Sequence, residues 1–256
     1  MREWFHPEWK PLLSAQGLNQ FDAIWGLELG WFEEPNKCRG GWSGVSRMDV
    51  RTVNGDTRGI FIKRQENHVY KSLMHPLKGE PTSVREFENI KRYHHAGVPT
   101  LNVVYFAARN NNGKRQAILI TEELSGYKPL DQFITENRPI LSEKRNIVAV
   151  LAAAIRCLHD HHLQHNCLYP KHIFIKQQEN GIDVRLIDLE KTKRRWRRMS
   201  ACLRDLDTLN RHSPQWSRTD RLRFLLAYMG QTNMDKGAKT LWRRLDKKRK
   251  KKSPRT

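Results

Sequence analysis

The chain has 256 residues, of which 47 are lysine or arginine and 27 are aspartate or glutamate, giving a formal net charge of +20. This length allows one large domain or two small lobes with a real hydrophobic core, and 38% apolar residues exclude a wholly disordered chain. The longest apolar run, 148–155, is too short for a transmembrane helix of ~20 residues, and the N-terminus lacks the apolar h-region of a signal peptide. The charge favours a polyanionic partner: nucleic acid, an anionic membrane face or a phosphorylated glycolipid.

The cysteines are widely spaced and form no Cys-x-x-Cys pair, which indicates a reducing compartment without structural zinc, although counting alone leaves two disulfides open. They are Cys38, Cys157, Cys167 and Cys202. We therefore expect a cytoplasmic protein that rests on a membrane surface, which the family resemblance given below identifies as the inner membrane.

The first 122 residues are predicted to form mainly strands and turns. Residues 45–53 and 59–63 alternate in polarity around Asn54-Gly55-Asp56, a strong hairpin signal. The spacing of Phe87, Ile90 and His94 predicts a helix over 83–95 with Ser83 as its N-cap. Two more strands are predicted at 101–109 and 115–124.

After residue 125 the pattern becomes helical. A wide apolar stripe predicts a helix over 142–162, capped by Ser142. A hairpin is expected around residues 179–181, followed by basic helices. The predicted domains are a β-rich N-terminal lobe (1–122), a larger helical C-terminal lobe (123–245) and a basic tail (246–256) that is either solvated or a frayed helix.

The N-terminal lobe offers residues that could bind a nucleotide. The turn "RGGWSG" (39–44) could present backbone N–H groups to phosphates, which makes Gly40, Gly41, Ser43 and Gly44 candidate binding residues. Lys63 ends a strand, as does the V-A-I-K lysine of protein kinases, which contacts the α- and β-phosphates. Glu86 is its predicted partner on the next helix, and Glu88 is the weaker candidate.

The C-terminal lobe carries a second set of candidates in "HNCLYPKH" (165–172), which aligns without a gap on the kinase pattern H-R-D-L-x-x-x-N. His165 takes the histidine place, Cys167 the catalytic aspartate place and His172 the asparagine place. After a predicted hairpin, Asp188 in "LIDLEK" stands where the D-F-G aspartate holds Mg²⁺. Five strands and one helix before a mostly helical half complete the order of an α+β, bilobal protein-kinase-like fold.

The chain resembles the lipopolysaccharide kinase group, the Kdo kinase and WaaP-like families, and most closely the InaA-like and toluene-tolerance-protein branch. The matching stretches cover most of residues 37–230 and are "RGGWSGVSR", "FIKRQ", "REFENIKRYHHAGVPT", "LHDHHLQHNCLYPKHIFI", "VRLIDLEKTKRR" and "DRLRFLLAYMG".

This resemblance implies an ATP- and Mg²⁺-dependent phosphotransferase that acts on a heptose-type sugar of the lipopolysaccharide inner core, or another anionic glycolipid, at the anionic inner-membrane surface. By motif match, Lys63 and Glu86 form the ion pair, Asp188 holds the metal and His172 occupies the second metal-ligand position. Cys167 departs from the family, whose catalytically clear members have aspartate there. A pseudokinase that serves as a scaffold in envelope biogenesis is therefore the alternative.

Two further interpretations compete with these. His161 and His165 are four residues apart, as in a zinc site, but the glutamate of H-E-x-x-H is missing. The segment "KTKRRWRR", with Trp196 among arginines, suits nucleic acid, but no nucleic-acid-binding motif is present, so nucleic acid is the disfavoured partner.

The N-terminal region is rich in aromatic residues, which we expect to pack onto the small lobe rather than enter a membrane interface. They are Trp4, Phe5, Trp9, Phe21, Trp25, Trp31 and Phe32.

Overall fold

The computed structural model describes residues 1–38, 40–70, 79–179 and 181–252, with side chains described up to residue 248. Arg39, the first position of the predicted glycine-rich turn, lies outside the described residues. The chain divides into two compact units, which we call the N-terminal unit (Met1–Lys91 and Leu101–Ser125) and the C-terminal unit (Arg92–Thr100 and Gly126–Thr256). Within the described residues, no helix is long and apolar enough to cross a membrane.

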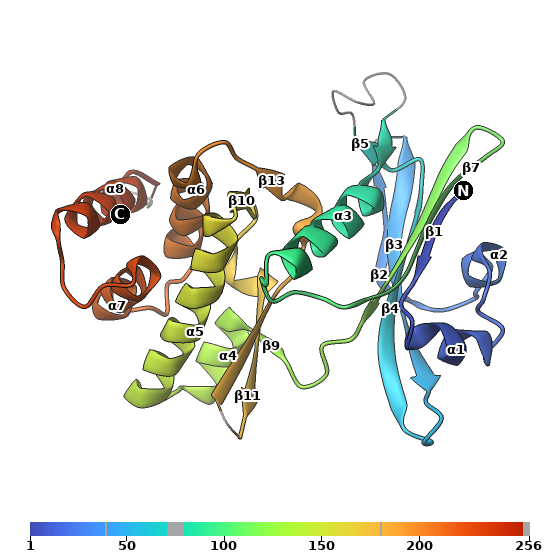
Figure 1. The fold of residues 1–256 in the computed structure, drawn as a ribbon, viewed down its shortest axis with the longest axis horizontal. Coiled ribbons are helices and arrows are strands. Elements are labelled where there is room, and N and C mark those ends of the chain that lie inside the picture. Colours follow the sequence, from blue (N-terminus) through green and yellow to red (C-terminus); the bar gives the residue numbers. More distant parts are fainter. Residues whose placement is uncertain (39, 71–78, 180, 253–256) are drawn as a thin grey trace. The chain divides into compact units, whose positions relative to one another are not determined.

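The N-terminal unit is built on an antiparallel sheet of six strands in the order β1-β7-β8-β4-β3-β2 (Figure 1). The elements up to residue 125 are β1 (Arg2–Phe5), α1 (Trp9–Ser14), α2 (Phe21–Trp25), β2 (Trp31–Cys38), β3 (Gly41–Arg51), β4 (Thr57–Glu66), β5 (Val69–Tyr70), β6 (Glu80–Pro81), α3 (Thr82–His95), β7 (Val103–Asn111) and β8 (Lys114–Glu122). The hairpin predicted around Asn54-Gly55-Asp56 is confirmed as β3 and β4.

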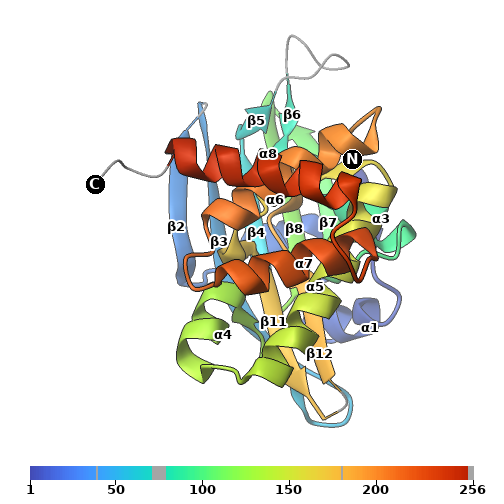
Figure 2. The same cartoon turned by 90° about the vertical axis from the view of Figure 1, so that its left-hand side faces the viewer.

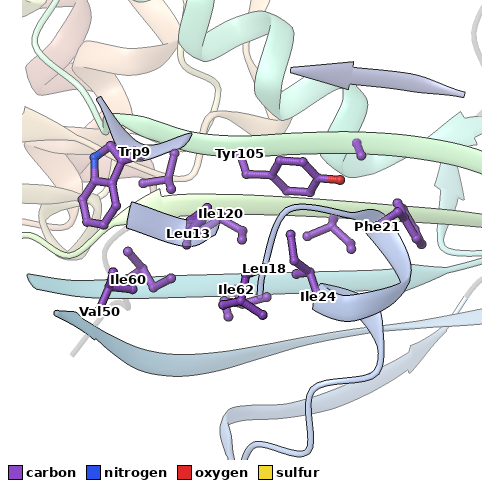
Figure 3. Packing of buried hydrophobic residues seen from close by; sticks show 13 residues of the cluster. Trp9, Leu13, Leu18, Phe21, Ile24, Val50, Ile60, Ile62, Tyr105 and Ile120 are labelled. Atoms are coloured by element: carbon purple, nitrogen blue, oxygen red, sulfur yellow. The ribbon is translucent and has the colours of Figure 1, made fainter. Parts of the chain in front are cut away.

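Alternation along β4 directs side chains to opposite faces of the sheet. On one face Ile60 and Ile62 are buried in a cluster with Trp9 and Leu13 of α1 and residues of α2 (Figure 3). On the other face α3 packs, and its Phe87 stacks on Phe106 of β7 with ring centroids 4.1 Å apart. Both faces of β4 are therefore covered, and its odd-numbered side chains Lys63 and Gln65 point toward α3.

The N-terminal aromatic residues mostly follow the prediction that they pack onto this unit. Trp9 and Phe21 are buried, and Phe21 stacks on Trp25. Phe32 is the exception, because 61% of its surface is exposed even though its ring contacts Phe61 at a centroid distance of 4.9 Å.

The C-terminal unit is mostly helical. Its elements are β9 (Lys128–Pro129), α4 (Leu130–Asn137), α5 (Leu141–Asp160), β10 (Leu163–Gln164), the 3₁₀ turn η1 (Pro170–His172), β11 (Ile173–Gln178), β12 (Gly181–Leu186), the 3₁₀ turn η2 (Leu189–Lys191), β13 (Lys193–Arg194), α6 (Arg198–Arg211), α7 (Arg218–Met229) and α8 (Lys236–Lys252). Helix α7 packs on α5, and α8 packs on α6 and α7 (Figure 2). The hairpin predicted before Asp188 is present as β11 and β12.

One boundary differs from the sequence predictions. Residues 92–100 group with the C-terminal unit, where the Thr100 hydroxyl donates a hydrogen bond to the Leu186 carbonyl at 2.6 Å. Helix α8 runs to Lys252, so the basic run after residue 245 begins as helix, which is one of the two forms predicted for it.

The predicted helix caps are also corrected. Helix α5 begins at Leu141 rather than after Ser142, and the Glu143 carboxylate accepts a hydrogen bond from the backbone N–H of Ile140 at 2.8 Å. In this contact the Glu143 side chain reaches back to the residue before the helix, as the glutamate of a capping box does. It satisfies one of the backbone donors that the helix start leaves unpaired.

Candidate functional site

The predicted glycine-rich turn lies where β2 is followed by β3, and glycine is required at its positions for different structural reasons. Gly40 has φ +79°, in the left-handed region that glycine adopts at low cost. A Cβ on Gly41 would lie 2.1 Å from the Glu66 carbonyl oxygen, and one on Gly44 would lie 2.5 Å from the Trp31 ring. Close packing therefore accounts for Gly41 and Gly44, and a phosphate-binding role for the turn stays a prediction.

Lys63 and Glu86 are brought together in the N-terminal unit. The Lys63 Nζ lies 2.7 Å from Glu86 Oε2, and Glu86 is buried, with 7% of its surface exposed. Glu88, the weaker candidate, instead pairs with Arg2. The geometry thus selects Glu86 on the sheet-facing side of α3 as the partner of the lysine.

A buried glutamine, which the sequence analysis missed, fixes the start of α3 above β4. Gln65 Nε2 donates to Ser43 Oγ at 3.0 Å and to Thr82 Oγ1 at 2.9 Å, while its Oε1 accepts from the Ser83 backbone N–H at 2.9 Å. Ser83 is therefore not the N-cap of α3, because the helix begins at Thr82. The acceptor for the first-turn N–H of Ser83 is the Gln65 side chain on β4. Gln65 lies two residues after Lys63, on the same face of β4, and Glu86 lies three residues after Ser83, on the same face of α3. The contact between Gln65 and Ser83 therefore fixes which residue of α3 lies opposite Lys63.

In the C-terminal unit a buried aspartate of α6 holds the backbone of the 165–172 loop. Asp205 is fully buried and accepts hydrogen bonds from the backbone N–H groups of His165 at 2.6 Å and Asn166 at 2.9 Å. The Nε2 atom of His159 lies 3.2 Å from Oδ2 of the same carboxylate. The sequence did carry a signal, because Asp205 lies within the apolar stripe of α6, between Cys202 and Leu209.

His165 lies inside the protein, where it contributes to the loop rather than to its surface. Burial lowers the pKa of its imidazole to about 4, so the ring is neutral near pH 7. Its Nδ1 accepts the backbone N–H of Cys167 at 3.3 Å. The neutral ring thus supports the local turn at the position that the kinase pattern gives to histidine.

Cys167 is a buried thiol, with 6% of its surface exposed. Burial raises its pKa above the usual range and the charge of Asp188 acts in the same direction, while Lys191 opposes them. A thiol with a raised pKa is protonated at neutral pH. It therefore cannot accept a proton as the aspartate of the kinase pattern does.

His172 and Asp188 lie side by side. The His172 Nδ1 is 2.8 Å from the Cys167 carbonyl oxygen and 3.4 Å from Asp188 Oδ2. Both neighbours are acceptors, so this nitrogen must carry the proton and donate. Only Nε2 of His172 remains available for a metal ion, whereas the Asp188 carboxylate, 36% exposed, keeps lone pairs for one.

The backbone around these residues is unusual in three places. His162, Asn166 and Asp188 have φ of 58°, 67° and 60°, in the left-handed region that is uncommon outside glycine. The Asn166 side chain donates to the Lys191 carbonyl at 2.9 Å and so ties the loop to the turn after Asp188. Such conformations gather at functional sites, where the surrounding contacts maintain them.

The loop and the turn after Asp188 line a pocket of about 560 Å³ in the C-terminal unit. Its lining residues are Asp131, Cys167, Tyr169, Pro170, Lys171, His172, Asp188, Lys191 and His212. A second cavity, of about 370 Å³ and mainly apolar, lies between α6, α7 and α8, and none of the residues predicted from the sequence line it.

The donor set fits Mg²⁺ that arrives with a phosphate ligand. Among the described residues, no group of three or more His, Cys, Asp or Glu side chains could hold a metal ion. Magnesium commonly binds to one or two carboxylates and completes its shell with phosphate oxygens and water, for which Asp188 suffices. The His161 ring contacts the Cys157 carbonyl at 3.0 Å and His165 is buried, so this histidine pair forms no zinc site.

Comparison with known proteins places these features in a family. The model of the lipopolysaccharide kinase (Kdo/WaaP) family matches residues 22–228. Protein InaA of Escherichia coli is 32% identical over 197 residues, which cover 76% of this chain and 88% of that protein. The lipopolysaccharide core heptose(I) kinase WaaP of Pseudomonas aeruginosa is 28% identical over 200 residues, covering 71% and 73% of the two chains.

A solved structure, that of WaaP in complex with acyl carrier protein, has the same fold with a TM-score of 0.71. It is 22% identical in sequence, and the match covers 98% of this chain and 99% of that one. The predicted protein-kinase-like fold, with a β-rich N-terminal and a helical C-terminal lobe, is confirmed. The chain belongs to the lipopolysaccharide kinase (Kdo/WaaP) family.

Proposed function

We propose that the chain transfers the γ-phosphate of ATP to a hydroxyl of a heptose-type sugar in the lipopolysaccharide inner core. The observation that carries this proposal is the Lys63–Glu86 ion pair in a member of this family. A buried carboxylate that fixes a strand lysine is the arrangement with which kinases bind phosphates. The location that follows is the cytoplasmic, anionic surface of the inner membrane, with the protein bound peripherally to a glycolipid acceptor.

The residues would divide the work of holding Mg·ATP. Lys63 would bind phosphate oxygens while Glu86 orients it, and backbone N–H groups of the turn at Gly40, with the Ser43 hydroxyl, would add neutral donors. Asp188 would hold Mg²⁺. When bound, Mg·ATP supplies the phosphoryl group and neutralises its charge, and the protein contributes position and electrostatic stabilisation.

The loop residues act mainly by orienting others. His172 donates from Nδ1 to the Cys167 carbonyl, which holds the ring beside the Asp188 carboxylate and leaves Nε2 for the second metal position. His165 supports the backbone of Cys167. Because phosphoryl transfer depends mostly on positioning and charge, the loss of a general base slows the reaction by about 10²–10⁴-fold without abolishing it.

Labelled ATP, Mg²⁺ and purified core oligosaccharide test the proposal directly. We expect slow transfer by the unmodified protein and at least about 100-fold less by Asp188→Asn, which removes the metal-binding charge. Asp183→Asn is the matched control, because Asp183 lies on β12, the strand that precedes Asp188, and outside the pocket lining, and it should leave transfer unchanged. Equal activity in Asp188→Asn and the unmodified protein would refute the assignment.

A second function, that of a pseudokinase scaffold, is favoured by one observation, the buried neutral thiol of Cys167. Cys167→Asp separates the two. A slow kinase should gain about 10²–10⁴-fold in transfer rate when a carboxylate returns, whereas a scaffold should show no transfer with either residue. Cys167→Ser serves as the control, because it changes the side chain without supplying a base.

A further inference from the structure

The segment that follows the candidate site exposes an aromatic side chain among basic ones. In residues 193–199, which we call the Trp196 segment, Trp196 is 95% exposed and Met199 is 48% exposed. Tryptophan is highly buried on average, so a nearly complete exposure is informative. No ring, cation–π or hydrogen-bond contact involves the Trp196 side chain in the described part of the chain.

The backbone on both sides of Trp196 is held in place. Strand β13 pairs with β10, and the Arg195 backbone N–H donates to the His162 carbonyl at 2.7 Å, while the Arg195 side chain donates to Gln164 (Figure 1). On the other side, Arg198 donates to Asp160, and its guanidinium lies 5.3 Å from the centre of the Tyr228 ring. The segment therefore presents Trp196 from a fixed base.

The basic residues of the segment fall into two groups. Arg195 and Arg198 are partly buried and make the contacts just described. Lys193, Arg194 and Arg197 are exposed, and no ion pair involves them among the described residues. Three exposed cations thus flank the exposed tryptophan in the sequence, which is the pattern of a surface for an anionic partner.

We propose that the Trp196 segment binds an anionic phospholipid surface. Trp196 and Met199 would enter the headgroup region, where tryptophan is favoured because it has an apolar body and a polar N–H. Lys193, Arg194 and Arg197 would contact lipid phosphates, each strengthening binding by about fivefold. A membrane suits the segment better than a nucleic acid does, because single-stranded nucleic acid stacks on successive aromatic rings and Met199 provides none.

This inference rests on the proposed function for its biological meaning. Asp188 precedes Lys193 by five residues, and Lys191, between them, lines the pocket that contains Asp188. Binding through the Trp196 segment would bring the candidate site of the C-terminal unit to the surface that carries a glycolipid acceptor.

Sedimentation of the full chain with vesicles tests the proposal. We expect binding to vesicles that contain phosphatidylglycerol and not to phosphatidylcholine vesicles. Trp196→Ser should weaken binding by about tenfold, and Arg194→Gln with Arg197→Gln should weaken it by about 25-fold. Val53→Ser, at a 91% exposed apolar residue, and Lys37→Gln with Arg51→Gln, which removes the same charge from the N-terminal unit, are the matched controls and should bind normally.

Fluorescence supplies a second measurement. Anionic vesicles should shift the tryptophan emission of the unmodified protein to shorter wavelength, and Trp196→Ser should lose that shift. Unchanged vesicle binding by Trp196→Ser would overturn the proposal. A variant that kept vesicle binding but lost binding to a single-stranded oligonucleotide would assign the segment to nucleic acid instead. Transfer to soluble core oligosaccharide distinguishes the two proposals: if it is absent while vesicle binding depends on Trp196, the proposed function fails and the membrane surface stands.

Discussion

In the N-terminal unit the candidate groups are two opposite charges in contact, whereas in the C-terminal unit a protonated thiol stands where a charged base is expected. Lys63 and Glu86 are supported by Gln65, which fixes α3 on β4. The loop around Cys167 is equally well supported, because Asp205 holds its backbone. The difference lies in the side chain at one position, so under the proposed function we expect nucleotide binding and proton transfer to be separable by substitution.

Asp205→Ala should reduce the free energy of unfolding more than any other variant proposed. It tests whether the loop at 165–172 is held as firmly as α3. Removal of the carboxylate leaves two buried backbone N–H groups without an acceptor, which should cost about 3–5 kcal/mol of the free energy of unfolding. Urea denaturation measures this. Glu136→Gln, which removes an exposed ion pair with Lys128, should leave the free energy of unfolding nearly unchanged. A similarly small change for Asp205→Ala would show that water replaces the carboxylate.

The pH dependence of stability should be dominated by the C-terminal unit. The folded chain binds a proton on His165 only below about pH 4, while the unfolded chain binds it from about pH 6.5. Between these values the unfolded state holds more protons, so the free energy of unfolding falls as the pH falls, by up to about 3 kcal/mol. Urea denaturation from pH 7 to 4 should show this slope, and His165→Leu should flatten it; an unchanged slope would assign the effect to other histidines.

Gln65→Leu sharpens the comparison from the side of the N-terminal unit. It removes the acceptor of the Ser83 N–H and two donors, and we expect a loss of about 2 kcal/mol in the free energy of unfolding. Because the register of α3 is disturbed, affinity for Mg·ATP should also fall severalfold in a titration. Gln132→Ala, at an exposed glutamine of α4, is the control and should change neither quantity. Normal nucleotide affinity in Gln65→Leu would show that binding does not depend on the register of α3.

Lys63→Met should have a small effect on stability and a clear one on binding. The buried Glu86 carboxylate loses its partner, which should cost about 1–2 kcal/mol, and the added change Glu86→Gln should recover most of that loss. Affinity for Mg·ATP, measured by calorimetry, should stay reduced by about 10–100-fold in both variants. Recovery of binding in the double variant would show that Lys63 has a structural role only.

The sequence predicted the elements that depend on local patterns. The alternation around Asn54-Gly55-Asp56 and the apolar stripe of α5 were sufficient for the β3–β4 hairpin and for the helix. The helix starts were predicted wrongly, because the groups that satisfy the first turns come from Gln65 on another strand and from Glu143 inside the helix. Such partners depend on tertiary contacts, which a local pattern does not contain.

The candidate site followed the same rule. Motif spacing proposed Lys63, Glu86, His172 and Asp188 as candidates, which the structure brings together in two pairs. It could not reveal which nitrogen of His172 faces Asp188 or how deeply Cys167 lies. These properties depend on the packing of α6 and on the turn after Asp188. The roles of these residues in phosphate transfer stay predictions until the variants are measured.

The left-handed backbone at Asn166 limits how this loop can vary. Asparagine, aspartate and glycine accept a positive φ most readily, and other residues cost about 1–2 kcal/mol there, so a saturation library at position 166 should rank replacements by backbone preference rather than by size or charge. Cys167 has no such restriction, because its φ is not positive. The shape that presents residue 167 is therefore encoded by its neighbours, and selection can exchange the side chain at that position without rebuilding the loop.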